Sequence, residues 1–240
     1  MNLIVDIGNT STKLAVYNGK ERESVLRINE LSCDELEKNL TGRKIERAII
    51  SSVKKLPPFI LDLISANIPS VHILSHISRF PFKLDYETIE TLGTDRIAAV
   101  AGAYNLFPEA EVLIIDAGSA ITYDFLSEGV YKGGNISPGI LMRFKALNKF
   151  TGRLPLLTLT DNFSFPGRNT NDAITAGVIT GVIYEINEYI RTFEKKETEF
   201  KIILTGGEGS YLKDKINHHH TYMPDIVIDG LNNILEYNAT

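Results

Sequence analysis

The stretch Asp6-Ile7-Gly8-Asn9-Thr10-Ser11-Thr12-Lys13, close to the start of the chain, decides the fold. It follows the apolar run Leu3-Ile4-Val5, which is typical of a buried strand, and it precedes a second apolar run at residues 14–17. Asn18-Gly19 then predicts a hairpin turn. A strand, a polar turn and a returning strand can place backbone N–H groups and hydroxyls around an anion, so this stretch is a candidate phosphate loop.

The same pattern recurs 110 residues later, where Asp116 takes the place of Asp6. Apolar residues 112–115 lead into Asp116-Ala117-Gly118-Ser119-Ala120-Ile121-Thr122, and a turn at Glu128-Gly129 follows. Two copies of one hairpin unit predict two similar halves whose Asp-X-Gly turns face one cleft. The alternative is that Asp-X-Gly merely forms turns, since both residue types are common there. The matched pair favours the phosphate-binding interpretation.

Composition excludes several classes of protein. The 240 residues carry a formal net charge of −5, which argues against general affinity for nucleic acid or anionic membrane. The one cysteine, Cys33, cannot form an intrachain disulfide. The N-terminus shows no signal-peptide pattern, and no apolar run approaches the length that crosses a bilayer. We therefore expect a cytoplasmic protein that binds neither nucleic acid nor membrane.

Hydrophobic periodicity predicts an α/β protein with mixed sheets. Beyond the hairpins we expect strands at residues 23–28, 47–53, 71–74, 201–204 and 224–229, and helices at 33–40, 59–66, 97–104, 141–150, 172–193 and 231–237. A polar break at residues 108–111 places the boundary between two subdomains, 1–111 and 112–240. Gly177 and Gly181 on the long helix predict close packing against another element.

Gly93-Thr94-Asp95-Arg96 immediately precedes an apolar helical segment. Thr94 or Asp95 is well suited to cap that helix, and Asn171 or Asp172 to cap the long one. Asp95 could instead act on a substrate, and Arg96 could pair with it or bind a substrate oxygen. The residues alone leave these uses open.

Glycine-rich segments follow two of the expected strands. One is Gly133-Gly134-Asn135-Ile136-Ser137-Pro138-Gly139, whose composition demands unusual backbone angles or close approach of another group. The other is Thr205-Gly206-Gly207, which either lets backbone lie flat against a base or ribose or forms an ordinary strand-to-helix turn.

Taken in order, these motifs resemble those of the type III pantothenate kinases, bacterial enzymes of the acetate and sugar kinase, Hsp70 and actin superfamily. The resemblance covers essentially the whole chain and also includes Gly167-Arg168-Asn169-Thr170 and residues 224–231. It implies two ribonuclease-H-like subdomains with an ATP cleft between them. The first, residues 1–111, would hold the first phosphate loop and the pantothenate motif. The second, residues 112–240, would hold the second phosphate loop, the adenosine region and the long helix.

The resemblance also implies a reaction, the ATP-dependent phosphorylation of pantothenate to 4′-phosphopantothenate, the first step of coenzyme A biosynthesis. Asp95 is implied as the catalytic base. The residues implied to bind pantothenate are Tyr86, Gly93, Thr94, Asp95, Arg96 and Thr170, the last of these possibly from a partner subunit in a homodimer. Those implied to bind ATP are Asp6, Ile7, Gly8, Asn9, Thr10, Ser11, Thr12, Lys13, Ser119, Gly206 and Gly207.

The same resemblance implies bound cations. Asp116 is implied to hold a monovalent cation, K⁺ or NH₄⁺, and Asp6 to hold the Mg²⁺ of the nucleotide through water. Ser119 departs from the family, which usually has threonine there, but it keeps the hydroxyl. Two other functions are compatible with the same fold: a non-catalytic accessory regulator, and a kinase of another small hydroxy acid. The intact Gly93-Thr94-Asp95-Arg96 and both Asp-X-Gly turns favour the kinase.

Overall fold

The computed structural model describes residues 1–194 and 200–239, and it forms two compact units. The first comprises Met1–Glu109, Leu126–Lys132 and Asp225–Thr240, and the second Ala110–Phe125 and Gly133–Pro224. The first junction lies close to the boundary expected after residue 111. The expected subdomains differ from these units chiefly in the last helix, which packs with the first unit.

The first unit is built on a five-stranded mixed sheet with the order β3-β2-β1-β4-β5. Its strands are β1 (Asn2–Ile7), β2 (Thr12–Asn18), β3 (Glu21–Ile28), β4 (Arg47–Ser52) and β5 (Ser70–Ile73). β1 pairs antiparallel with β2 and parallel with β4, so the expected hairpin is confirmed. Gly19 in its turn has φ +59°, the left-handed region that glycine adopts without strain.

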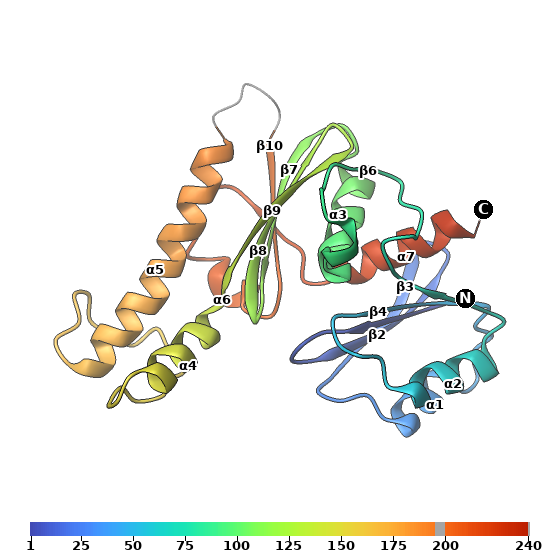
Figure 1. The fold of residues 1–240 in the computed structure, drawn as a ribbon, viewed down its shortest axis with the longest axis horizontal. Helices are drawn as coiled ribbons and strands as arrows, with labels where there is room; N and C mark the ends of the chain where they lie inside the picture. Colours follow the sequence, from blue (N-terminus) through green and yellow to red (C-terminus); the bar gives the residue numbers. More distant parts are fainter. Residues whose placement is uncertain (195–199, 240) are drawn as a thin grey trace. The chain divides into compact units, whose positions relative to one another are not determined.

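Helices cover both faces of this sheet (Figure 1). α1 (Cys33–Leu40) and α2 (Pro58–Asn67) cover one face, where Leu3, Val5 and Ile7 of β1 join a core with Leu36 and Ile60 of the helices. Because successive residues of a strand point to opposite faces, Asn2, Ile4 and Asp6 lie on the other face. That face is covered by α3 (Thr94–Leu106) and α7 (Ile226–Asn238).

Two glycines bring α3 and α7 together. A Cβ atom at Gly230 would lie 1.8 Å from the carbonyl oxygen of Ala98, and one at Gly102 would lie 2.5 Å from that of Ile226.

The strand expected at residues 224–229 is wrong, because the helix α7 begins at Ile226. Its first three residues are all buried, so the segment lacks the polar gaps that mark an amphipathic helix.

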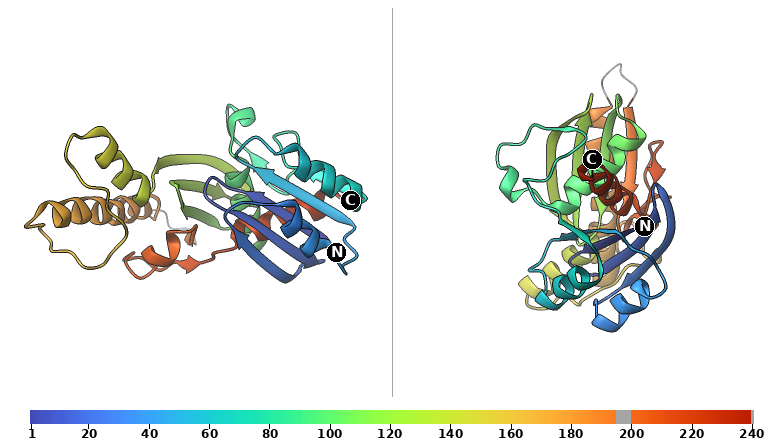
Figure 2. Two further views of the ribbon diagram at one scale, coloured as in Figure 1. Left: turned by 90° about the horizontal axis from the view of Figure 1, so that it is seen from below. Right: turned by 90° about the vertical axis from the view of Figure 1, so that its right-hand side faces the viewer.

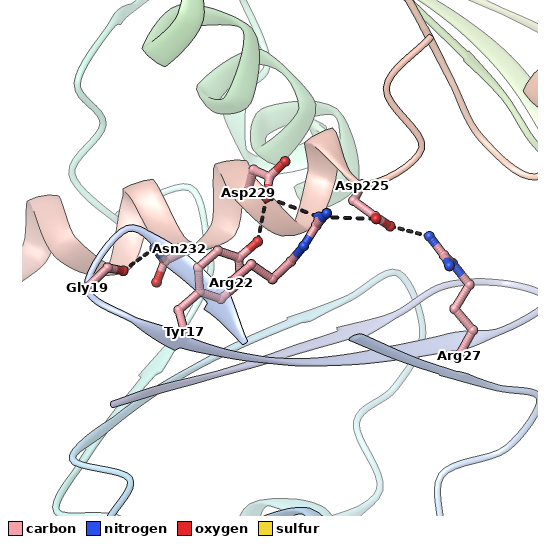
Figure 3. A network of polar contacts seen from close by, with 7 residues as sticks. All are labelled: Tyr17, Gly19, Arg22, Arg27, Asp225, Asp229 and Asn232. Carbon is pink, nitrogen blue, oxygen red and sulfur yellow. Dashed lines mark hydrogen bonds and ion pairs between the residues drawn. The ribbon is translucent and has the colours of Figure 1, made fainter. Parts of the chain in front are cut away.

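Polar contacts also fix α7 to the β2–β3 hairpin (Figure 3). Tyr17 donates a hydrogen bond of 2.5 Å to Asp229, and burial together with this bond raises the pKa of Tyr17. Asp225 forms ion pairs with Arg22, at 3.1 Å, and with Arg27. These polar contacts join α7 to a hairpin about 200 residues earlier in the chain, whereas the two glycines join α7 to α3.

The second unit contains the other hairpin. Its strands lie in the order β11-β10-β7-β8-β9, with bounds β7 (Glu111–Ala117), β8 (Ala120–Ser127), β9 (Val130–Pro138), β10 (Phe200–Thr205) and β11 (Thr221–Tyr222). The turn between β8 and β9 has positive φ at both Glu128 and Gly129, as a type I′ turn requires. β8 and β9 extend into the first unit, where β6 (Lys83–Leu84) pairs with the start of β9 and is followed by the 3₁₀ turn Ile89–Thr91.

Helices α4 (Ile140–Phe150), α5 (Thr170–Phe193) and α6 (Gly209–Leu212) complete the second unit. α4 and α5 lie side by side (Figures 1 and 2) and share a core with β7 and β8 that includes Leu113, Ile115, Phe144 and Val182. The expected helices at 33–40, 59–66, 97–104, 141–150 and 172–193 are confirmed, as are the strands at 23–28, 47–53, 71–74 and 201–204, with small shifts at their ends. Among the residues described, no helix combines the length and apolar character needed to cross a bilayer.

Three local expectations are wrong. Gly93, rather than Thr94 or Asp95, is the N-cap of α3. Asn169 is the N-cap of α5, accepting a hydrogen bond of 2.9 Å from the backbone N–H of Asp172. No atom of the described residues, α5's own backbone apart, comes within 4 Å of a Cβ built at Gly177 or Gly181, so these glycines do not mark close packing there.

Candidate active site

The first Asp-X-Gly turn joins β1 to β2 in the first unit. The backbone N–H of Gly8 donates to the carbonyl of Ser11 at 3.0 Å and closes the turn. Asn9 and Thr10 are exposed at its tip, and Lys13 lies opposite Asp6 in the antiparallel register. The flanking Ile7 and Thr12 are buried strand residues that pair with each other.

Asp6 is a buried carboxylate at the end of β1, with 8% of its surface exposed. Desolvation raises its pKa to about 6, and the charge of Asp95 adds to this, while Lys13 and hydrogen bonding by Ser51 lower it. Its Oδ1 atom makes no hydrogen bond to any residue that the structure describes. A buried oxygen in this condition is costly unless it meets a cation or a donor.

Asp95 lies in the first turn of α3, on the same face of the sheet as Asp6. Its Oδ1 accepts a hydrogen bond of 2.9 Å from the backbone N–H of Arg96. A Cβ atom at Gly93 would lie 2.5 Å from that oxygen, so a larger residue there would make the Asp95 side chain shift. Thr94 Oγ1 lies 3.1 Å from the buried Ser51 Oγ, which lies opposite Asp6 in the pairing of β1 with β4.

Arg96 is buried against two aromatic rings. Its guanidinium carbon lies 5.9 Å from the ring centre of Tyr86 and 6.0 Å from that of Tyr131, within range of cation–π attraction. The two rings stack on each other with their centres 6.0 Å apart. Tyr131 was missed by sequence reasoning. Its place two residues before Gly133-Gly134, on the inward side of β9, is the signal that could have found it.

The second Asp-X-Gly turn belongs to the second unit. The backbone N–H of Gly118 donates to the carbonyl of Ala120 at 3.0 Å, and Asp116 and Ser119 are half-buried. Gly206 has φ +90°, and a Cβ atom there would lie 2.4 Å from Asp116 Oδ1. The segment after β10 is therefore packed directly against this turn.

Thr205, Gly207 and Glu208 complete this part of the second unit. Thr205 Oγ1 is buried and makes no hydrogen bond to a described residue. Thr205 pairs with Asp116 across β10 and β7, which places both side chains on one face of the sheet. Gly207 is exposed, whereas the carboxylate of Glu208 accepts hydrogen bonds from the first residues of α4. Sequence reasoning also missed Glu208.

Thr170 is the first residue of α5 and is exposed. A pocket of about 340 Å³ lies beside it, lined in part by Asn169, Asn171, Asp172 and Thr175. The residues described contain no group of three or more His, Cys, Asp or Glu side chains that could hold a metal ion. The candidate site residues thus gather in separate places: Asp6, Lys13, Asp95 and Arg96 in the first unit, and Asp116, Ser119 and Gly206 in the second.

Comparisons with known proteins agree with one another. Residues 2–192 match the family model described as type III pantothenate kinase. A type III pantothenate kinase of Porphyromonas gingivalis W83 is 43% identical over 243 residues, covering 99% of each chain. One from Bacteroides fragilis YCH46 is 42% identical, covering 99% of this chain and 98% of its own. One from Flavobacterium psychrophilum is 38% identical, covering 99% of each.

Solved structures show the same fold at lower identity. A Campylobacter jejuni protein, described as a candidate Baf family transcriptional activator, superposes with a TM-score of 0.65 at 24% identity, covering 99% of this chain and 98% of its own. A candidate N-acetylmannosamine kinase from Listeria monocytogenes has a TM-score of 0.57 at 13% identity, covering 100% and 99%.

Proposed function

We propose roles for individual residues, and the premise is that this chain belongs to the type III pantothenate kinases. The chain transfers a phosphoryl group from ATP to pantothenate and so takes part in coenzyme A biosynthesis. Its fold is the two-unit α/β fold of actin-like ATPases and sugar kinases. The assignment of these roles rests on one observation, which is that Asp6 and Asp95 lie on the same face of the first sheet.

Asp95 is the proposed catalytic base. An ordinary carboxylate, with a pKa of about 3.9, is too weak to ionise an alcohol in advance. Asp95 instead accepts a hydrogen bond from the attacking hydroxyl of pantothenate, orients it and takes its proton late in the transfer. The hydrogen bond from the backbone N–H of Arg96 to Asp95 Oδ1 supports this role, because it limits where the carboxylate points.

The turn Asp6 to Lys13 is the proposed first nucleotide-binding loop. The backbone N–H of Gly8 closes the turn, so the N–H groups and hydroxyls of residues 9–12 are those that face phosphate oxygens, and Lys13 supplies positive charge. The buried Asp6 Oδ1, which meets no donor among the described residues, fits a cation held through water. Magnesium bound there would neutralise phosphate charge. In the second unit, the turn at Asp116 to Ser119 with Gly206 and Gly207 is the second nucleotide-binding element.

Arg96, Tyr86, Gly93 and Thr94 form the proposed pantothenate-binding group. The stacked rings of Tyr86 and Tyr131 hold the guanidinium of Arg96 in a fixed plane, which suits a group that must meet a carboxylate or a moving phosphoryl oxygen. Arg96 could serve either oxygen, and the substrate dependence of an Arg96 variant distinguishes the two.

A monovalent cation, K⁺ or NH₄⁺, is proposed at Asp116. Its carboxylate and the buried hydroxyl of Thr205, which meets no partner among the described residues, lie on one face of paired strands. Oxygen donors of this kind fit a hard cation. The cation would supply positive charge beside the second turn.

A homodimer is also proposed, in which Thr170 contacts substrate. The exposed position of Thr170 at the start of α5 is compatible with contact from a second subunit. Several large apolar side chains of the second unit are exposed on β9, α4 and α5: Ile136, Leu141, Met142 and Tyr184. Exposed apolar surface of this kind often marks an interface.

The test of the function is an ADP-release assay across candidate acceptors. Purified protein with Mg²⁺ and ATP in K⁺ buffer is offered pantothenate, pantetheine and sugar acids, with mass spectrometry of the product. We expect rapid ADP release and a 4′-phosphorylated product with pantothenate. Turnover of another acid in preference to pantothenate would point to the other kinase function. Loss of ATP turnover with every acceptor would point to the regulator.

A further inference from the structure

We infer that Glu208 is a positioning residue that fixes the second Asp-X-Gly turn and the adjacent glycines for the nucleotide. This inference rests on the proposed nucleotide-binding role of those two segments. Glu208 is buried, with 7% of its surface exposed, and follows Gly206-Gly207 directly. It is one of very few buried acidic residues in the second unit for which the proposed reaction has no use.

Both carboxylate oxygens of Glu208 bind the start of α4. Oε2 accepts a hydrogen bond of 2.9 Å from the backbone N–H of Ile140, and Oε1 accepts one of 3.2 Å from that of Leu141. The first N–H groups of a helix have no partner within the helix, and its N-terminus carries partial positive charge. The N-cap of α4 is Gly139, which has no side chain to satisfy them. Glu208 therefore caps α4 from another element of the unit.

The backbone of Glu208 is bound to the second turn. Its N–H donates to the carbonyl of Ala117 at 2.8 Å. The preceding Gly206 lies so close that a Cβ atom there would be 2.3 Å from the same carbonyl oxygen. One residue thus holds the end of β7 with its main chain and the start of α4 with its side chain.

The start of α4 is itself packed on the second turn. The N–H of Gly139 donates to the carbonyl of Ser119 at 3.1 Å, and a Cβ atom at Gly139 would lie 2.1 Å from the carbonyl oxygen of Gly118. Residues 139–141 and residues 205–208 therefore both pack on residues 116–119, with no room for a Cβ atom at Gly139 or Gly206. The side chain of Glu208 joins two of these segments, because it accepts hydrogen bonds from the backbone of Ile140 and Leu141.

Glutamine cannot replace this carboxylate in full. A carboxylate accepts from two donors, whereas the amide group of glutamine would turn its NH₂ toward one of the two N–H groups. The Glu208→Gln variant keeps the size of the side chain but loses one hydrogen bond and the charge at the helix terminus. Its effect should appear at the second turn, and so in nucleotide affinity, rather than at Asp95 or Arg96.

The experiment compares Glu208→Gln and Glu208→Asp with wild type in three measurements: the Kd for ADP by calorimetry, the separate KM values for ATP and pantothenate, and the thermal midpoint. We expect Glu208→Gln to raise the Kd for ADP and the KM for ATP about tenfold, since a hydrogen bond to a charged group is at stake. The KM for pantothenate should change less than about twofold. Glu208→Asp, which keeps the charge, should recover part of the affinity.

A matched control removes a helix cap elsewhere. Ser32 Oγ accepts from the backbone N–H of Glu35 at the start of α1 in the first unit, so Ser32→Ala should lower the thermal midpoint and leave every kinetic constant as in wild type. If Glu208→Gln behaves like Ser32→Ala, or raises both KM values equally, the inference is overturned. The calorimetry needs no phosphoryl acceptor. An inactive wild type that nevertheless binds ADP, with weaker binding in Glu208→Gln, would overturn the proposed function while keeping this inference.

Discussion

Asp95, in the first turn of α3, acts electrostatically on Asp6, at the end of β1: burial raises the pKa of Asp6 to about 6, and the charge of Asp95 adds to this rise. Two carboxylates from distant parts of the sequence thus act on each other in one place, with Lys13 partly compensating them. Such an arrangement is costly for the folded protein in the absence of a cation. A bound Mg²⁺ would offset this unfavourable free energy, so two close carboxylates suit a site that binds a magnesium nucleotide.

Replacing Asp95 tests the proposed base directly. Asp95→Asn should fold, bind ADP as wild type does and lose about 10²–10⁴-fold in kcat, the usual contribution of general-base catalysis. Asp62→Asn, an exposed carboxylate on α2, is the matched control and should retain full activity. Steady-state kinetics and calorimetry check both. A near-normal kcat in Asp95→Asn would leave Asp95 as a structural residue of the first turn of α3.

Asp6 gives the protein a specific pH dependence of stability. Burial raises the pKa of Asp6 to about 6 in the folded protein, against an ordinary value of 3.8 in the unfolded chain, so the folded state binds this proton more tightly. The Asp6 contribution therefore destabilises the protein progressively as pH rises from about 4 to about 6, and the full cost remains above pH 6.

Asp6→Asn removes that cost. In magnesium-free buffer at pH 7.5 the variant should have a higher free energy of unfolding than wild type, by up to about 3 kcal/mol. The difference should shrink toward pH 4.5. Urea denaturation across this range measures it, with Asp62→Asn as the control whose difference from wild type stays constant. If Asp6→Asn were less stable than wild type at pH 7.5, the ionised Asp6 carboxylate would not be destabilising the folded protein.

Adjacent glycines after β10 provide a matched pair. Gly206→Ala places a Cβ atom 2.3 Å from the carbonyl oxygen of Ala117 at a residue with φ +90°, and should cost about 1–3 kcal/mol of stability and much of the ADP affinity. For Gly207→Ala no described atom beyond the two chain neighbours lies within 4 Å of the new Cβ, so stability should stay within about 0.5 kcal/mol. Urea denaturation measures the stability of both variants, and calorimetry measures their affinity for ADP. Equal destabilisation of both variants would argue against the packing of Gly206 on the second turn.

The aromatic packing of Arg96 should be specific to a guanidinium. Arg96→Lys keeps the charge but loses the planar group held by Tyr86 and Tyr131, and should raise the KM for pantothenate about tenfold with little change in the KM for ATP. Arg79→Lys is the control, because Arg79 also lies over an aromatic ring, that of Tyr237, but is exposed. A fall in kcat with an unchanged KM for pantothenate would instead assign Arg96 to the moving phosphoryl group.

The cation proposed at Asp116 is tested by exchange of salts. Replacing K⁺ with Na⁺ at constant ionic strength should lower kcat severalfold, and NH₄⁺ should restore it. In Asp116→Asn the rates in K⁺ and Na⁺ buffers should become equal. Circular dichroism in both buffers serves as the control for folding. Equal wild-type rates in potassium-free sodium buffer would count against this site.

Sequence reasoning succeeded where the signal is local. The apolar runs around Asp6 and the turn at Asn18-Gly19 are enough to define the hairpin of β1 and β2. It failed where neighbours far along the chain decide the structure. The helix at residues 226–238 begins in a fully buried segment whose apolar pattern predicts a strand.

The site shows the same division. Asp6, Asp95 and Arg96 lie in motifs that can be recognised, and the structure brings Asp6 and Asp95 together on one face of the first sheet. Tyr131 and Glu208 contact residues that lie 45 and 68 positions away in the sequence, Tyr86 and Ile140. Neither has a pattern of its own that would reveal such a partner.

The packing of α7 also determines when this protein can become active during its synthesis. Both α3 and α7 cover the face of the first sheet that carries Asp6, so this face and the side of α3 that packs on α7 are incompletely covered until residues 226–238 have left the ribosome. At about 5–20 residues per second, the first hairpin waits on the order of ten seconds or more for the helix that completes its unit. The residues made first are therefore among the last to reach their working positions, and ribosome-bound chains that lack α7 should neither bind nucleotide nor resist protease.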